Sequence, residues 1–351
     1  MDTQIQSEMQ EILEQINGFK NKPVWPGNEL LPPSVINILW TFTTGKRIAR
    51  SDPRLIKFLN LLQKRSKAFD MSGGILSQMP WLRYFAPEKT GFSLIKNLNT
   101  EFHTFFMEII NEHLANYTDD KSNEDLIYAY IKEMKSQQAN VSTNFTLKQL
   151  VMIILDIFIA GSQTTSITID LAIMITLIRA DLQTNIFKEI HSVLGSDGNP
   201  NYADRAKMPF VEAFLLEVQR FFHIVPISGP RRVMKKCELG GFTIPKNTTV
   251  LIGLRSVLMD PEFWKDPHEF KPERFLDENM NIRNVERLYS FGSGRRKCLG
   301  DMLAKACIFT FFVGILQKFE LKLSGEEIPS LELLPGITLS PKPYKVIFAK
   351  R

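Results

Sequence analysis

The residues best suited to chemistry are gathered in the segment FGSGRRKCLG, at positions 291–300. Its cysteine, Cys298, follows three consecutive cations and precedes a helix that we predict over about 300–317. Positive charges and the N-terminal amides of a helix both favour a thiolate over a thiol. Glycines at 292, 294 and 300 would let the backbone turn tightly and approach a flat, bulky partner. A thiolate held in this way suits a soft metal such as iron, whereas an isolated cysteine is more often a small buried hydrophobic residue.

A second candidate group is the stretch IAGSQTTS, residues 159–166, inside a long apolar helix predicted over about 147–179. Gly161 within a helix costs about 1 kcal/mol relative to alanine, so close approach by a flat ligand would justify it. The alternative is a crossing with another helix through small residues. Thr164 could donate or relay a proton through its hydroxyl. Gln163 could hold a water molecule by hydrogen bonds, but its amide does not ionise.

Two charged residues on a later helix, predicted to follow Pro209, are spaced so that they can interact. Glu217 and Arg220 stand at positions i and i+3, on one helical face. Taken alone, such a pair is most often a solvated surface contact. Farther along, the segment VPISGPRR ends in Arg231 and Arg232, whose guanidinium groups match a carboxylate in two-point hydrogen bonds.

Together these segments resemble the cytochrome P450 family. The haem-binding signature FxxGxRxCxG, with five fixed positions in ten, is matched here by Phe291, Gly294, Arg296, Cys298 and Gly300. The resemblance implies that the Cys298 thiolate is the axial ligand, and hence the metal ligand, of a haem b group, iron protoporphyrin IX. It also implies that Phe291, Gly294 and Gly300 shape the loop under the haem, and that Gly161 approaches the haem from the other side.

Three further motifs follow the order of the family. Glu217 and Arg220 match its ExxR, and PERF at 272–275 supplies Arg274; the resemblance implies that these three residues form a buried ion network. IAGSQTTS resembles its AGx[DE]TT oxygen-activation motif, with Gln163 where an acid is usual. Thr164, with Gln163 beside it, is therefore our candidate for the catalytic group, and Asp156 is expected to have a structural partner. For the haem propionates, Arg231 and Arg296 are the candidate contacts.

The implied activity is that of a monooxygenase, which inserts one oxygen atom of O2 into a lipophilic substrate. Its expected electron donors are NADPH-cytochrome P450 reductase and cytochrome b5, which would dock near Arg295, Lys297 and Lys305. The overall pattern is similar to microsomal, insect members such as methyl farnesoate epoxidases, so the expected location is the cytosolic face of the endoplasmic reticulum membrane. A haem-thiolate isomerase that needs no reductase is an alternative, against which Thr164 argues.

The elements that must position these residues indicate a mainly α fold with a small β portion. Helices are predicted over about 1–19, from Ser34 as N-cap to Gly45, from Pro53, over 93–116, 123–136 and 147–179, and after Pro209. The loop at 71–91 is expected on the surface with its apolar side chains turned inward. After about residue 227 short extended pieces follow, including a hairpin over 242–253 that turns at 245–247. We predict one domain over 1–351, with a helical part at 1–226 and a β, meander and cysteine-loop part at 227–351.

Bulk properties agree with a folded protein and exclude several other classes. The 351 residues are 44% hydrophobic and carry a net charge of +5, with no basic tract that would suggest nucleic acid. The 26 phenylalanines indicate a thick apolar interior or a cavity for an apolar ligand. The three cysteines form no CxxC pair, which argues against a disulfide framework and favours a reducing compartment. The apolar stretch 150–178 contains Asp156, Gln163 and Asp170, so we expect a buried helix there and not a bilayer span.

The resemblance begins after the N-terminal features that are typical of the family. The membrane anchor, the first sheet strands, the early helices and the propionate-binding WxxxR have no counterpart before Trp40. We therefore expect the chain to be N-terminally truncated, with an exposed sheet edge near 242–253 and weak haem binding as an isolated protein. The competing hypothesis is a non-catalytic remnant or a fragment of such an enzyme.

Overall fold

The computed structural model describes residues 2–68, 75–76, 79–137, 143–336 and 338–351. Helices dominate it, and its strands are short and paired two by two, so the predicted fold class is confirmed. The helices are α1 (Asp2–Phe19), α2 (Leu31–Thr44), α3 (Pro53–Ala68), α5 (Leu82–Phe85), α6 (Phe92–Ala115), α7 (Leu126–Ser136), α8 (Leu147–Ile178), α9 (Ala180–Leu194), α10 (Pro209–Phe222), α11 (Leu254–Leu258), α12 (Pro261–Trp264) and α13 (Asp301–Lys318).

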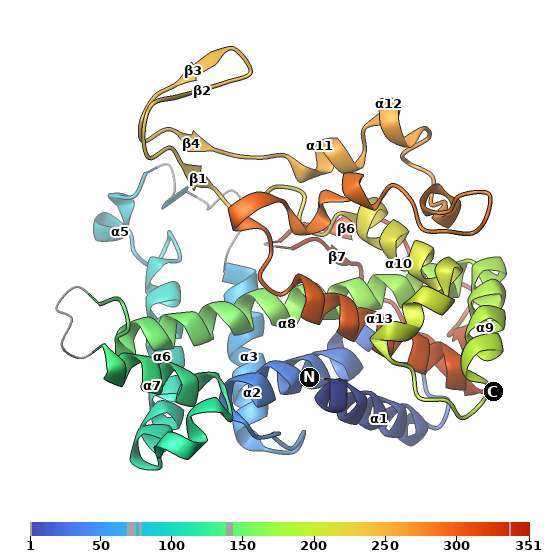
Figure 1. Ribbon diagram of the computed structural model, residues 1–351, viewed down its shortest axis with the longest axis horizontal. Coiled ribbons are helices and arrows are strands. Elements are labelled where there is room, and N and C mark those ends of the chain that lie inside the picture. The colour runs from blue at the N-terminus through green and yellow to red at the C-terminus, as the bar shows by residue number, and fades with distance from the viewer. Residues whose placement is uncertain (1, 69–74, 77–78, 138–142, 337) are drawn as a thin grey trace.

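Helix α8 crosses the middle of the protein, with other helices on both sides of it (Figure 1). It packs against α2, α6, α10 and α13, and residues from Ile169 to Leu177 are almost completely buried. Within the described residues, α8 is the one helix that by length and composition could cross a membrane, and 44% of its most apolar window is buried in the protein. These contacts agree with the buried helix that we expected.

Local signals placed several helix boundaries correctly and others wrongly, and the short helices α5, α11 and α12 were not predicted. Gly45 ends α2 in the left-handed region at φ 71°, and Pro53 begins α3, both as predicted. Ser34 is not an N-cap, because α2 already begins at Leu31 and the Ser34 hydroxyl instead accepts a hydrogen bond from Arg50 at 2.6 Å. Helix α9, which directly follows α8 after a break at Arg179, was not predicted.

The strands form four antiparallel pairs. They are β1 (Arg231–Arg232) with β4 (Thr249–Val250), β2 (Cys237–Leu239) with β3 (Phe242–Ile244), β5 (Phe319–Leu323) with β8 (Val346–Lys350), and β6 (Leu333–Leu334) with β7 (Ser340–Pro341). The hairpin predicted over 242–253 is wrong. The chain reverses at Gly240 and Gly241, both at positive φ, so that β3 pairs backward with β2. The turn at 245–247 leads on to β4, whose partner is β1.

The phenylalanines fill the interior. Phe58 of α3 contacts four other phenylalanines, those at 102, 105 and 106 of α6 and 158 of α8, with ring centroids 4.9–5.8 Å apart, and Trp40 of α2 completes this cluster. These rings pack against one another edge to face or stacked, which is the arrangement aromatic pairs prefer. Of the two interpretations of the composition, the structure therefore supports the thick apolar interior.

The part of the 71–91 loop that the structure describes contradicts our expectation of inward-facing side chains. Trp81, Tyr84 and Phe85, on and beside the short helix α5, are 55%, 72% and 79% exposed. Residues 71–74 and 77–78 of this loop lie outside the described part. The apolar composition of the loop signalled an exposed aromatic surface and not a contribution to the core.

Candidate functional site

Cys298 lies in a turn held by its own backbone. The short 3-10 turns η6 (Tyr289–Phe291) and η7 (Gly294–Arg296) precede it, and α13 begins at Asp301. The Cys298 amide donates a hydrogen bond to the Phe291 carbonyl oxygen at 2.8 Å, which closes the loop. Gly292 and Gly294 both adopt φ near 70°, a region that favours glycine. Gly300 is at φ −91°, so its backbone does not require glycine. We had expected all three glycines of this segment to serve the tight turn.

The exposed Cys298 directly follows three positively charged residues, at 295–297. Lys297 pairs with Asp301 at 3.1 Å across the first turn of α13, and Lys305 lies over the Phe291 ring at 5.3 Å. No ion pair is recorded for Arg231 or Arg296 in the part of the chain that the structure describes. Both guanidinium groups therefore remain candidates for binding an anionic group from a ligand.

The donor set around Cys298 fits a haem better than a metal site made by the protein alone. Among the described residues there is no group of three or more His, Cys, Asp or Glu side chains that could hold a metal ion. A lone thiol can bind an iron whose other ligands come from a macrocycle. Apolar side chains beside it support this, because Leu299 is 95% exposed and Met302 is 58% exposed, as contacts to a flat apolar ligand would require.

The oxygen-side candidates lie on the open face of α8. Ala160 is exposed, Gln163 and Thr164 are partly exposed, and their neighbours Ser162 and Thr165 are buried. The Thr164 hydroxyl donates to the Ala160 carbonyl oxygen, one turn back, at 2.8 Å. Among these residues, Thr164 therefore places a hydroxyl, and Gln163 an amide, where a ligand could contact them.

Gly161 lies at a close contact between two helices. A Cβ atom built on it would lie 2.9 Å from Leu39 Cδ1 and 3.2 Å from Leu39 Cδ2. Leu39 belongs to α2, so the missing side chain allows α2 and α8 to approach each other. This is the small-residue crossing that we had held as the alternative, and it accounts for the glycine without a ligand.

The helix that follows Cys298 packs onto α8. Leu303 lies on the first turns of α13 and contacts the apolar cluster that contains Ile154 and Phe158 of α8. The same leucine also contacts the second apolar cluster, which includes the remainder of α13 and the C-terminal half of α8. Figure 1 shows the orange cysteine loop and the start of α13 above the middle of α8. The cysteine loop is therefore anchored to the helix that carries Thr164.

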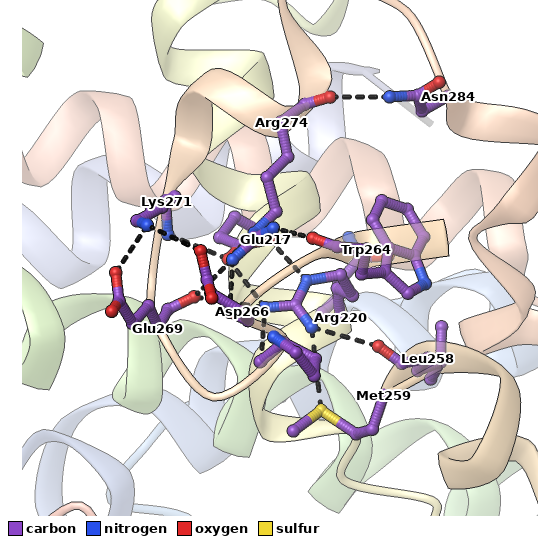
Figure 2. A network of polar contacts seen from close by, with 12 residues as sticks. Glu217, Arg220, Leu258, Met259, Trp264, Asp266, Glu269, Lys271, Arg274 and Asn284 are labelled. Carbon is purple, nitrogen blue, oxygen red and sulfur yellow. Dashed lines mark hydrogen bonds and ion pairs between the residues drawn. The ribbon is translucent and has the colours of Figure 1, made fainter. Parts of the chain in front are cut away.

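Glu217, Arg220 and Arg274 meet in one network (Figure 2). Glu217 and Arg220 are both 0% exposed, and their two hydrogen bonds measure 2.7 and 2.8 Å. Arg274 Nε lies 3.5 Å from the Glu217 carboxylate, and its terminal nitrogens bond to the carbonyl oxygens of Trp264, Lys265 and Asp266. Burial raises the pKa of Glu217, against the lowering effect of Arg220. The surface-pair alternative is thereby excluded.

The same network reaches the chain that leads to the cysteine loop. Arg220 donates to the Leu258 and Pro267 carbonyl oxygens, both at 3.0 Å, and the Lys271 amide donates to Glu217 at 2.9 Å. Two side chains of α10 thus satisfy backbone groups spread over 258–271, a stretch with little secondary structure of its own. The network can hold this irregular segment in one conformation.

One positioning group was missed by sequence reasoning. Helix α10 begins without a side-chain cap from its own N-cap residue, Met208. Glu189 of α9 replaces that cap, because its two carboxylate oxygens accept hydrogen bonds from the Phe210 and Val211 amides at 3.0 and 2.7 Å. Burial raises the pKa of this carboxyl group, against the effect of the two amides. No local pattern signals a cap that comes from 21 residues away.

Comparisons with known proteins identify the relatives of this chain. The family model described as "Cytochrome P450" matches residues 1–348. A probable cytochrome P450 305a1 of Drosophila melanogaster is 50% identical over all of this chain and 71% of its own length. Farnesoate epoxidase of Bombyx mori is 35% identical over 92% of this chain, and cytochrome P450 2D4 of Rattus norvegicus is 33% identical over 95%. The chain spans 65% and 66% of the lengths of these last two relatives.

Proposed function

The chain belongs to the cytochrome P450 family, and from this premise we propose that it acts as a haem-thiolate monooxygenase on a lipophilic substrate. The observation that carries the proposal is the Cys298 turn. There one exposed thiol stands between positively charged side chains and the N-terminus of α13, with no other metal-ligating cluster among the described residues. A cysteine in its thiolate form is the ligand that binds iron.

Haem bound at Cys298 would supply an iron centre for the activation of dioxygen, with the thiolate pushing electron density toward O–O cleavage. Residues of the chain would hold and orient this group. Cys298 would hold the iron, Arg231 and Arg296 would bind the propionates, and Gly292 and Gly294 would let the loop approach the ring. Glu217, Arg220 and Arg274 support the proposal by bracing the segment that precedes the loop.

Proton delivery would depend on α8. Thr164 has its hydroxyl on the open face of the helix, where it can donate to a ligand in place of the Ala160 carbonyl oxygen. Gln163 lies beside it and can hold a water molecule through its amide. Because glutamine does not ionise, protons would have to pass through water and the Thr164 hydroxyl.

We further propose a reductase, with cytochrome b5 as a second donor, as the electron-supplying partner. Arg295 and Lys297 are exposed beside Cys298, and Lys297 is 58% exposed even though it pairs with Asp301. An acidic protein surface would complement these charges, and association would weaken as salt increases.

Location at the cytosolic face of the endoplasmic reticulum membrane is also a proposal. Exposed aromatic side chains on and beside α5 support it, because Trp81, Tyr84 and Phe85 stand next to the basic Arg83. Aromatic rings together with cations are typical of a surface that meets lipid headgroups. Co-sedimentation of the purified chain with phospholipid vesicles would test this; no binding by the wild type would contradict it.

The absorption spectrum of the reduced, carbon-monoxide-bound protein tests the central proposal. We expect the thiolate-shifted band in the wild type, its loss in Cys298→Ala, and its retention in Cys237→Ala, which removes another exposed thiol. A wild type without this band would favour the non-catalytic remnant. NADPH consumption that depends on added reductase would then separate a monooxygenase from a haem-thiolate isomerase.

A further inference from the structure

Lys305 occupies a position that docking of a partner does not explain. It lies in the second turn of α13, and its ammonium group stands 5.3 Å from the centre of the Phe291 ring. A cation within about 6 Å of a ring centre is attracted to the face of the ring, more strongly where both are shielded from water. Lys305 and Phe291 are each only partly exposed, unlike Arg295 and Arg296, which are exposed beside them.

Phe291 is the residue that closes the cysteine turn. Its carbonyl oxygen accepts the hydrogen bond from the Cys298 amide, and its own turn is secured by the bond from the Gly292 amide to the Tyr289 carbonyl oxygen, also at 2.8 Å. A shift of Phe291 would therefore change the position of the Cys298 backbone. The Phe291 ring meets α13 through the Lys305 ammonium group.

A third element approaches the same lysine. Glu212, on the first turn of α10, is partly buried, and burial raises its pKa while the charges of Arg205 and Lys305 act to lower it. Lys305 thus lies against an aromatic ring on the loop, and its charge also acts on a carboxylate of α10. Helix α10 is also the helix that carries Glu217 and Arg220.

From this arrangement we infer that Lys305 is a positioning residue that fixes the Phe291 turn, and through it the Cys298 backbone, to α13. The inference goes beyond the docking role predicted for this lysine. Its importance for haem binding rests on the proposed function, but the contact itself does not, so it can be tested on the chain without haem.

Amide hydrogen exchange of Cys298 reports directly on the turn, because that amide donates to Phe291. Lys305→Met keeps most of the stem and removes the charge, so we expect exchange to accelerate about 2- to 5-fold, the equivalent of one partly exposed cation–π contact. Lys305→Arg should restore the wild-type rate. The matched control is Lys297→Met, which removes a cation closer in sequence to Cys298 and should leave the rate unchanged.

A second variant removes the ring. Phe291→Leu should accelerate exchange of the Cys298 amide, and adding Lys305→Met to it should cause no further increase, because the contact is already lost. Additive effects, an equal effect of Lys297→Met, or unchanged exchange in Lys305→Met would overturn the inference. So would faster exchange throughout α8, which would indicate general destabilisation. A wild type without the thiolate band would contradict the proposed function and leave these exchange results intact.

Discussion

The Arg220 guanidinium and the Glu217 carboxylate form a two-point ion pair with no exposure to solvent, at 2.7 and 2.8 Å. Removing Arg220 leaves the buried Glu217 carboxylate with only the more distant Arg274, at 3.5 Å, and the Lys271 amide, and breaking such a buried pair typically costs about 3–5 kcal/mol. We expect Arg220→Ala to lower the free energy of unfolding by that amount in urea denaturation. Arg179 and Asp181 form a pair of similar geometry, at 2.9 and 2.8 Å, whose side chains are 44% and 59% exposed. Arg179→Ala should cost at most about 1 kcal/mol, and equal losses would show that burial is not what matters.

Loss of the long-range cap should destabilise α10. Glu189→Gln keeps the size of the side chain but weakens the bonds to the Phe210 and Val211 amides, so we expect about 1–2 kcal/mol of lost stability. Thermal or urea unfolding measures the change. Glu326→Gln, at an exposed position, is the control and should have no measurable effect. Wild-type stability in Glu189→Gln would mean that water replaces the cap.

Asp170 should make stability depend on pH. Burial raises its pKa to about 6 from 3.8, despite hydrogen bonds from Tyr344 at 2.7 Å and Trp25 at 3.2 Å. Because the folded state holds the proton more tightly, this contribution to stability is full below about pH 4 and is lost as pH rises through about 6. The loss amounts to about 3 kcal/mol, from 1.36 kcal/mol per pKa unit. Urea midpoints between pH 4 and 8 should fall more steeply in the wild type than in Asp170→Asn. Parallel curves would refute the assignment.

The role of Gly161 in helix packing can be tested without any ligand. Gly161→Ala gains about 1 kcal/mol of helix propensity, but its Cβ would clash with Leu39, which typically costs about 1–3 kcal/mol. We expect net destabilisation, relieved by a second substitution, Leu39→Ala. Gly18→Ala, on α1 with no atom within 4 Å of its Cβ, should instead stabilise the protein by about 0.5–1 kcal/mol. A stabilising Gly161→Ala would restore the ligand-approach interpretation.

Thr164 should matter to turnover and not to folding. If its hydroxyl relays protons, Thr164→Val should lower substrate oxidation about 100-fold or more in the reconstituted enzyme. Thr176→Val removes a similar bond to the preceding turn, at 2.7 Å, but from a buried site on the same helix. Its oxidation rate per folded molecule should match that of the wild type. Equal losses in the two variants would exclude a proton-relay role for Thr164.

Features that depend on near neighbours were predictable from the sequence. The spacing of Phe291, Gly294, Arg296 and Cys298 identifies the family because a tight turn around one cysteine is encoded within ten residues. Helical periodicity located α1, α6, α8 and α10, and the i, i+3 spacing placed Glu217 next to Arg220.

Features that depend on distant partners were decided by the tertiary structure. The burial of the Glu217–Arg220 pair, the cap from Glu189 and the contact of Gly161 with Leu39 each join segments at least 20 residues apart or depend on what covers them. The hairpin predicted over 242–253 was wrong because the segments before and after β3 both have strand-like composition. Only the pairing of β3 with β2 selects the partner and the register of this strand. The sequence by itself therefore determined the family, and it made Cys298 the candidate ligand. The tertiary structure decided which groups hold that residue in place, because packing between distant segments leaves no local pattern.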